Sequence, residues 1–169
     1  MRLLKHESQY WPLALTLVSG EATLEEHLES LDAWNQWFSK AQPFHVIRVY
    51  LDDGSLRHPD GAAQATQRWM SEGAAEHMRK LVQSMLIVVP PDQYERMQKM
   101  SVRKAFGIPG GLFPSLDEAY AWLANPPEEV EGLPVAASLL EHVRHYVKGM
   151  AEVYQTDAVA DKRELPSAY

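Results

Sequence analysis

The stretch MLIVVPP, residues 85–91, decides the fold of this chain. Its first five residues form an unbroken apolar run, which is typical of a strand whose sheet is covered by helices on both faces. Two consecutive prolines then end the strand, because proline has no N–H to donate to a sheet ladder. We therefore expect residues 85–89 to form a central strand.

Two further apolar stretches predict strands on the amino-terminal side of this run. They are LALTLV, residues 13–18, and FHVIRVYL, residues 44–51, which is rich in β-branched and aromatic residues. The mixed run 2–8 predicts a weaker edge strand, and residues 112–113 predict a short final strand. Together these runs predict a four- to five-stranded sheet.

Helical patterns separate the strands. A capping box of Thr23 and Glu26 opens the first helix, and four helices are expected over residues 23–40, 59–80, 92–105 and 115–123. The first should bury the stripe Leu24, Leu28, Leu31, Trp34 and Phe38, with Trp37 off that stripe and available as a contact surface. The second should be weakened at Gly73. Alternating strands and helices predict an α/β domain with a mostly parallel sheet covered by about four helices.

The order and content of these stretches resemble the SpoIIAA-like group, which shares its fold with STAS domains. The resemblance rests on LALTLVSG (13–20), VIRVYLDD (46–53), LIVVPPDQYERM (86–97) and GLFPSLDEAYAWL (111–123). The last stretch carries the E-A-x-x-W-L ending of that group, at residues 118–123, and the resemblance covers about residues 1–124. It implies a small regulatory or interaction fold with no catalytic residues.

In the anti-sigma-factor antagonist branch of that group, a serine or threonine beside an aspartate is phosphorylated to switch partner binding. The corresponding stretch here, residues 52–61, lacks the D-S-S/T-G tetrad, and Ser55 is its only hydroxyl. Ser55 is therefore the candidate phosphosite, the alternative being an ordinary loop serine. Asp52 and Asp53 favour a turn over a magnesium site, because neighbouring strand residues point to opposite faces.

A glycine-rich bend, GIPGG at residues 107–111, lacks the G-K-[ST] ending of a phosphate-binding loop. Backbone N–H groups at Gly110 and Gly111, with Arg103 and Lys104 before them, could form an anion-binding nest. The alternative is plain turn geometry. Glu141, His142 and His145 share one helical turn but are expected on a solvated face, so no metal site and no cofactor is predicted.

The sequence changes character after Asn125. PPEEVEGLP predicts a connector over residues 125–133, followed by an amphipathic helix over residues 134–154 and a disordered tail over residues 155–169. The helix carries an apolar stripe that includes Leu139, Leu140, Val143, Val147 and Met150. Because the α/β domain is complete without this helix, we expect the stripe to pack on a protein partner or a second copy. The alternative is that it folds back over its own sheet.

Composition restricts the partners. The chain has 169 residues, and 16 basic against 23 acidic side chains leave a net charge of −7, which disfavours nucleic acid. It has no cysteine, which excludes disulfides and thiolate chemistry. No apolar run reaches the roughly 20 residues of a membrane helix, and the first residues lack a signal-peptide pattern. We expect a cytoplasmic protein without integral membrane association.

These observations favour two functions. The first is a non-enzymatic regulatory or interaction protein that binds a protein partner or associates with itself. The alternative is a carrier of a lipid or an anionic metabolite, because lipid-binding SEC14 domains are related in fold class. A hydrolase would require a pocket in which perturbed acids and bases converge.

Overall fold

The computed structural model describes residues 3–127, 130 and 134–164. Its five-stranded sheet has the order β1-β2-β3-β4-β5, and only β1 is antiparallel to its neighbour. The strands are β1 (Leu4–Glu7), β2 (Leu13–Val18), β3 (Phe44–Tyr50), β4 (Val82–Val88) and β5 (Gly110–Phe113). The predicted α/β class with a mostly parallel sheet is confirmed.

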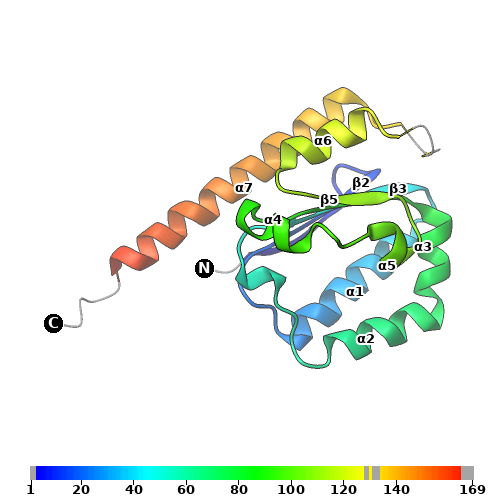
Figure 1. Ribbon diagram of the computed structural model, residues 1–169, viewed down its shortest axis with the longest axis horizontal. Coiled ribbons are helices and arrows are strands. Elements are labelled where there is room, and N and C mark those ends of the chain that lie inside the picture. The colour runs from blue at the N-terminus through cyan, green and yellow to red at the C-terminus, as the bar shows by residue number, and fades with distance from the viewer. Residues whose placement is uncertain (1–2, 128–129, 131–133, 165–169) are drawn as a thin grey trace.

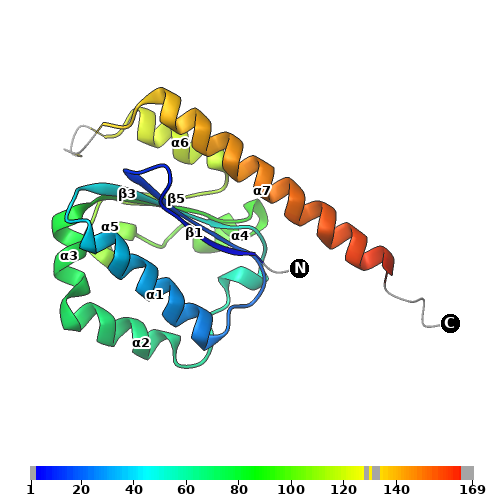
Figure 2. The same ribbon diagram turned by 180° about the vertical axis from the view of Figure 1, so that it is seen from behind.

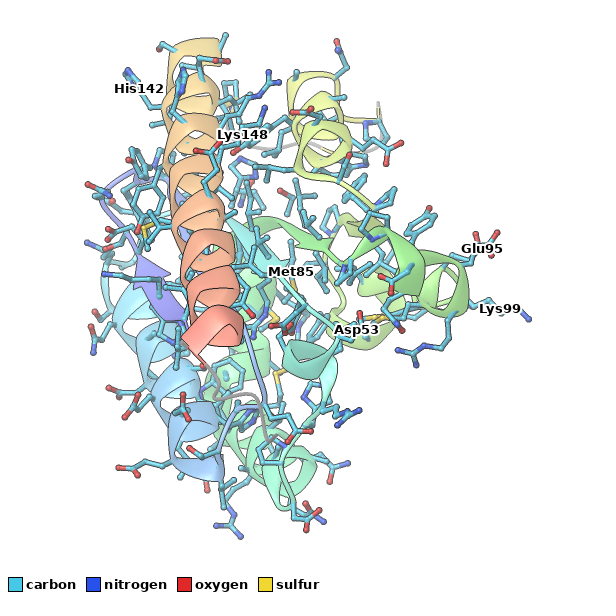
Figure 3. All side chains as sticks on the ribbon, turned by 90° about the vertical axis from the view of Figure 1, so that its left-hand side faces the viewer. Asp53, Met85, Glu95, Lys99, His142 and Lys148 are labelled. Carbon is cyan, nitrogen blue, oxygen red and sulfur yellow. The ribbon has the colours of Figure 1, made fainter. Side chains whose placement is uncertain are left out.

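The stretch that decides the fold lies inside the sheet. Met85 of β4 pairs with Val46 of β3 on one side and with Gly110 of β5 on the other. Figure 3 shows Met85 in the interior of the molecule. A Cβ atom at Gly110 would overlap the carbonyl oxygen of Met85. Glycine is therefore required at position 110 for β5 to approach β4 this closely.

Helices cover both faces of the sheet (Figures 1 and 2). One face carries α1 (Leu24–Ser39), α2 (Ala62–Trp69), α3 (Ala75–Leu81), α4 (Pro91–Met97) and α5 (Val102–Phe106). The other face carries α6 (Leu116–Ala124) and α7 (Ala137–Glu164). Strand residues alternate between two separate cores, so that Ile47 and Leu86 face α6 and α7 while Val46 and Met85 face the opposite way.

Helix α1 begins as predicted, with reciprocal hydrogen bonds between Thr23 and Glu26. Its predicted buried stripe is wrong in the first half, because Leu24 and Leu28 are 40% and 47% exposed. The same turns carry residues that line a pocket instead of a filled core. Trp37, predicted to lie off the stripe, is buried in the core of this face.

The next two predicted helices are both interrupted. Residues 59–80 form α2 and α3 on either side of a π-helical segment, η2 (Met70–Ala74), in which Gly73 has a φ of 127°, so the weak point at Gly73 is confirmed. A single helix over 92–105 is wrong, because the Ser101 hydroxyl accepts the Lys104 N–H and begins α5. Glu95 and Lys99 point away from the sheet in this region (Figure 3).

Helix α7 continues past residue 154 to Glu164, and its last turns extend beyond the sheet (Figure 1). Residues 155–164 lack an apolar stripe but contain neither glycine nor proline, and Pro166 follows the end of the helix. Residues 165–169 of the predicted tail, and 128–129 and 131–133 of the predicted connector, lie outside the described residues. Among the described helices, none combines the length and the apolar character needed to cross a bilayer.

Candidate functional site

The apolar stripe of α7 is covered by the chain's own sheet. Leu140, Val143 and Val147 are 8%, 0% and 3% exposed, within the same core as the strands and α6. Leu139 and Met150 are half-buried against that core. The helix therefore adopts the alternative arrangement, folded back on its own sheet, and these five side chains do not form an exposed interface.

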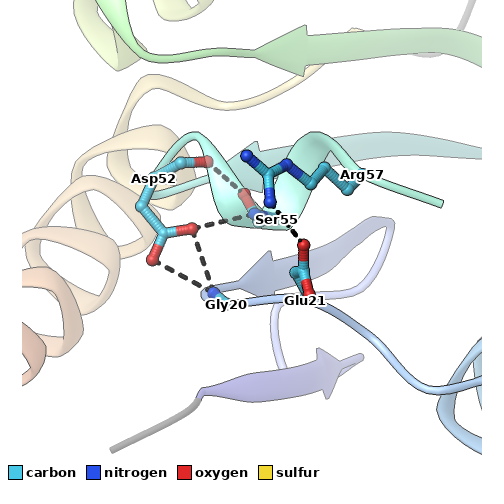
Figure 4. Close-up of polar contacts among 5 residues, drawn as sticks. All are labelled: Gly20, Glu21, Asp52, Ser55 and Arg57. Atoms are coloured by element: carbon cyan, nitrogen blue, oxygen red, sulfur yellow. Dashed lines mark hydrogen bonds and ion pairs between the residues drawn. The ribbon is translucent and has the colours of Figure 1, made fainter. Parts of the chain in front are cut away.

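Ser55 lies in a short 3-10 turn, η1 (Gly54–Leu56), after β3 (Figure 4). Its side chain is buried, and its hydroxyl donates to the Asp52 carbonyl oxygen at 2.6 Å. The Asp52 carboxylate accepts the N–H groups of Gly20 and Ser55, at 3.0 and 2.9 Å, and the hydroxyl of Tyr154 at 2.5 Å. Ser55 is thus part of a structural clamp, and its hydroxyl is not accessible to a modifying enzyme in this conformation.

The clamp changes the acidity of Asp52. Burial raises the pKa of this carboxyl, but the hydrogen bonds from Tyr154, Gly20 and Ser55 outweigh burial and hold the pKa below its usual value. Asp53 is exposed on the outside of the turn. The two aspartates therefore do not converge, in agreement with the turn interpretation.

The predicted anion nest is not a free loop. Gly110 and Gly111 belong to β5, opposite Met85 and Leu86, while Arg103 and Lys104 are exposed on α5. On the opposite face of the sheet from α5, His145 and Glu141 of α7 form an exposed pair at 3.5 Å. No cluster of metal-binding side chains occurs within the described parts of the chain.

A pocket of about 430 Å³ lies between the sheet and helices α1 and α2. Its inner wall is apolar and consists of Leu31, Trp34, Trp69, Met78, Met85, Ile87 and Phe106. Ala62 and Ala63 of α2 also line it, and their small side chains leave the space that larger residues would fill. The rim includes the exposed residues His58 and Gln67.

Polar groups gather where β3 ends. Arg48 and Tyr50 line the pocket from the carboxyl end of that strand. Nε of Arg48 donates to the Tyr50 hydroxyl at 3.3 Å. Nε2 of His27 lies 2.8 Å from Oγ1 of Thr66, which joins α1 to α2 beside the pocket. Ligand sites of open α/β sheets lie at the carboxyl ends of the strands, which is where these groups lie.

Arg48 occupies an unusual position. Phe44 and Val46, on the same face of β3, are completely buried apolar residues, whereas Arg48 brings a guanidinium into the same layer. No carboxylate pairs with Arg48 among the residues that the structure describes. Among the described residues, no aspartate or glutamate lines the pocket.

The charge of Arg48 affects two histidines. Burial and then Arg48 lower the pKa of His6 to about 4. The pKa of His27 is lowered by burial, by His58 and by Arg48, against the opposing effect of a hydrogen bond to the Ala62 backbone. Both imidazoles are therefore driven toward the neutral form.

The hydrogen bonds of His6 define its tautomer. Ser30 donates its hydroxyl proton to the Glu26 carbonyl oxygen at 3.2 Å, so it can only accept from His6 Nε2, also at 3.2 Å. Nδ1 of His6 then accepts from the Thr16 hydroxyl at 3.2 Å. A neutral His6 completes a network that joins β1, β2 and α1.

One pair of side chains in the pocket resembles part of a catalytic arrangement. The His27–Thr66 pair has the spacing of a base and a hydroxyl, but no carboxylate supports the imidazole from behind within the described residues. Serine and lysine are also missing from the described lining. The ionisable side chains of the described lining are His27, Arg48, Tyr50 and His58.

The sequence contains one signal for this site that lies outside the predicted site residues. In FHVIRVYL, every second residue shares a face, so Arg48 follows Phe44 and Val46 onto the buried side of an internal strand. A cation at such a position indicates a function. The pocket itself has no local signal, because it forms between elements distant in sequence.

Comparisons of the chain with protein-family models, with curated proteins and with solved structures give no match in any of the three.

Proposed function

We propose that this protein binds a small, largely apolar molecule in the pocket between α1, α2 and the sheet. The observation that carries the proposal is a cavity of about 430 Å³ lined mainly by apolar side chains, with a smaller number of polar groups such as Arg48, Tyr50 and His27 among them. Small-molecule sites have this composition and a volume of roughly 300 to 1,000 Å³. The function is carriage or sensing of the ligand, without catalysis.

The proposed fold family remains the SpoIIAA-like group. Support comes from the antiparallel β1 at the edge, the four parallel strands in sequential order, and the Ser115 cap that opens α6. A cytoplasmic location belongs to the same proposal. The protein-partner alternative has less support, because the α7 stripe on which it rests is buried within the chain.

Two tryptophan substitutions on α2 test the proposal. Ala63 lines the pocket at an exposed helix position, whereas its neighbour Gln64 is exposed and does not line it. Ala63→Trp should fill the entrance, and Gln64→Trp is the matched control on the same helix. Both substitutions place the ring at the surface, so both variants should fold.

The measurements are native mass spectrometry of gently purified protein and the thermal shift caused by added 1-decanol. Wild type and Gln64→Trp should retain a small bound mass or rise in Tm with 1-decanol, and Ala63→Trp should lose both responses. The proposal fails if wild type shows neither response, or if Ala63→Trp responds as wild type does.

A further inference from the structure

We infer that the ligand of this pocket is an amphipathic carboxylate, whose head group binds Arg48 and Tyr50 while its apolar body lies against the inner wall. The inference rests on the proposed function, because it specifies the chemistry of the same pocket. Arg48 and Tyr50 occupy the polar end of the pocket, and the aromatic and methionine side chains occupy the interior.

The environment of Arg48 is the first argument. Arg48 is half-buried beside apolar side chains, so its guanidinium loses part of its hydration, and an anion bound against it would recover that loss. Within the described residues, its contacts are the Tyr50 hydroxyl and the face of the Tyr50 ring, whose centre lies 5.6 Å from the guanidinium carbon. Neither contact carries a negative charge, so the counter-ion is missing from the part of the chain described.

Hydrogen-bonding geometry favours a carboxylate as that counter-ion. The bond to Tyr50 uses Nε of Arg48, and neither Nη atom makes a hydrogen bond to another described residue. A guanidinium with two such Nη donors can form a bidentate pair with a planar carboxylate. The Tyr50 hydroxyl accepts from Arg48 and keeps its own proton, which it can donate to the same anion.

The charge of the lining favours the same sign of ligand. The whole chain carries a net charge of −7, yet the ionisable side chains at the pocket are Arg48, His27, His58 and Tyr50, with no acidic residue among the described lining. The pocket is thus a local site for an anion on an acidic protein.

The volume limits the size of the ligand. At roughly 30 Å³ for each heavy atom, as in liquid water, the cavity of about 430 Å³ holds on the order of 14 heavy atoms. Decanoate fits within this volume, and 1-decanol has the same apolar chain with a neutral head. These two probes separate recognition of the head group from recognition of the chain.

Tryptophan fluorescence provides the measurement, because Trp34 and Trp69 line the pocket. Titrations of the full chain with decanoate, 1-decanol and decyl phosphate give three values of Kd. We expect decanoate to bind roughly tenfold or more tightly than 1-decanol, the ratio that corresponds to one charge-assisted hydrogen-bonded pair, and more tightly than decyl phosphate.

Substitution of Arg48 assigns that preference to its guanidinium. Arg48→Met keeps the apolar stem and should remove the preference for decanoate while leaving 1-decanol affinity within about twofold, and Arg48→Lys should restore part of the preference. Arg68→Met removes an exposed arginine of α2 outside the pocket and should behave as wild type. Melting curves establish that each variant is folded.

The outcomes separate the two proposals. Equal binding of decanoate and 1-decanol, tighter binding of decyl phosphate, or an unchanged preference in Arg48→Met would overturn the carboxylate assignment and leave the pocket as a binding site. If none of the three probes binds to wild type, the carboxylate inference and the proposed binding function both fail for this size of ligand.

Discussion

The two faces of the sheet use the same strands and are filled differently. Toward α6 and α7, Leu86, Val143 and their neighbours are fully buried in an apolar core, and a smaller pocket of about 170 Å³ lies beside the end of α6. Toward α1 and α2, a pocket of about 430 Å³ remains and a guanidinium enters the layer. The difference indicates that one face mainly stabilises the fold and the other provides the site.

The face of the sheet toward α1 and α2, called the hollow face below, differs between the two ends of its strands. Phe44, at the start of β3, packs among aromatic rings, with centroid distances of 6.3 Å to Trp34, 6.3 Å to Trp37 and 6.2 Å to Phe38. Tyr50, at the end of the same strand, lines the pocket. Aromatic packing therefore stabilises the amino end of this layer and leaves its carboxyl end available for a ligand.

The largest expected effect comes from truncating a leucine on each face. Leu86→Ala should reduce the free energy of unfolding by about 2 to 5 kcal/mol, because it opens a cavity in a filled core. Leu31→Ala should cost less than about 1.5 kcal/mol, because Leu31 is half-buried beside an existing pocket. Urea unfolding measures both, and equal losses would contradict the difference between the faces.

The Asp52 clamp joins α7 to the loops at the carboxyl ends of β2 and β3. It therefore tests how far the α7 side of the fold depends on polar contacts as well as on its apolar core. Asp52→Asn should cost about 1 to 2 kcal/mol at neutral pH, since it weakens bonds from Tyr154, Gly20 and Ser55. Asp53→Asn, at an exposed position, should change stability by less than about 0.5 kcal/mol.

The pH dependence of that loss has a defined sign. The pKa of Asp52 in the folded protein lies below its usual value of 3.8. Its stabilising charge is therefore fully present above about pH 4 and is lost as the pH falls through the folded pKa. The gap between wild type and Asp52→Asn should shrink below pH 4, and a gap that grows on acidification would contradict the clamp.

His6 tests the network through which it joins β1, β2 and α1. Its pKa is about 4 in the folded protein and 6.5 when unperturbed, so between these values the unfolded chain binds a proton that the folded chain does not. Stability should fall as the pH drops from 6.5 to 4, by on the order of 1 to 2 kcal/mol after solvent screening. His6→Gln should flatten this dependence in unfolding curves, and His142→Gln, on the outside of α7, should not.

The smallest expected effect concerns the link between α1 and α2. Thr66→Val removes the hydroxyl partner of His27 and should cost about 0.5 to 1.5 kcal/mol, whereas Thr66→Ser keeps the partner and should cost less. Thermal unfolding measures both variants. A Thr66→Val variant as stable as wild type would show that the hydrogen bond to His27 contributes nothing.

The sheet was predictable because burial on two faces appears locally in the sequence. The run of residues 85–89 and the alternation in FHVIRVYL both indicate strands without reference to distant residues. Helix caps were readable for the same reason at Thr23 and Ser115. At Ser101 the capping interaction divided a helix that periodicity alone had predicted as continuous.

The site was less predictable because it depends on which surfaces of elements distant in sequence pack against one another. Small side chains on a helix are compatible with close packing against a sheet or with an empty space, and at Ala62 of α2 they leave part of a cavity. The α7 stripe predicted burial correctly, but periodicity cannot say whether the covering surface belongs to the same chain. Its helix also extends past residue 154, because an apolar stripe reports packing and a helix can continue without one.

An NMR titration with decanoate tests the central claim most directly, because backbone amide shifts report both faces in one experiment. We predict that the largest shift changes occur at α1, α2 and the end of β3, at residues such as His27, Thr66 and Tyr50, with little change along α6 and α7. Changes concentrated on α6 and α7, or no changes at any accessible decanoate concentration, would contradict the assignment of the hollow face as the binding site.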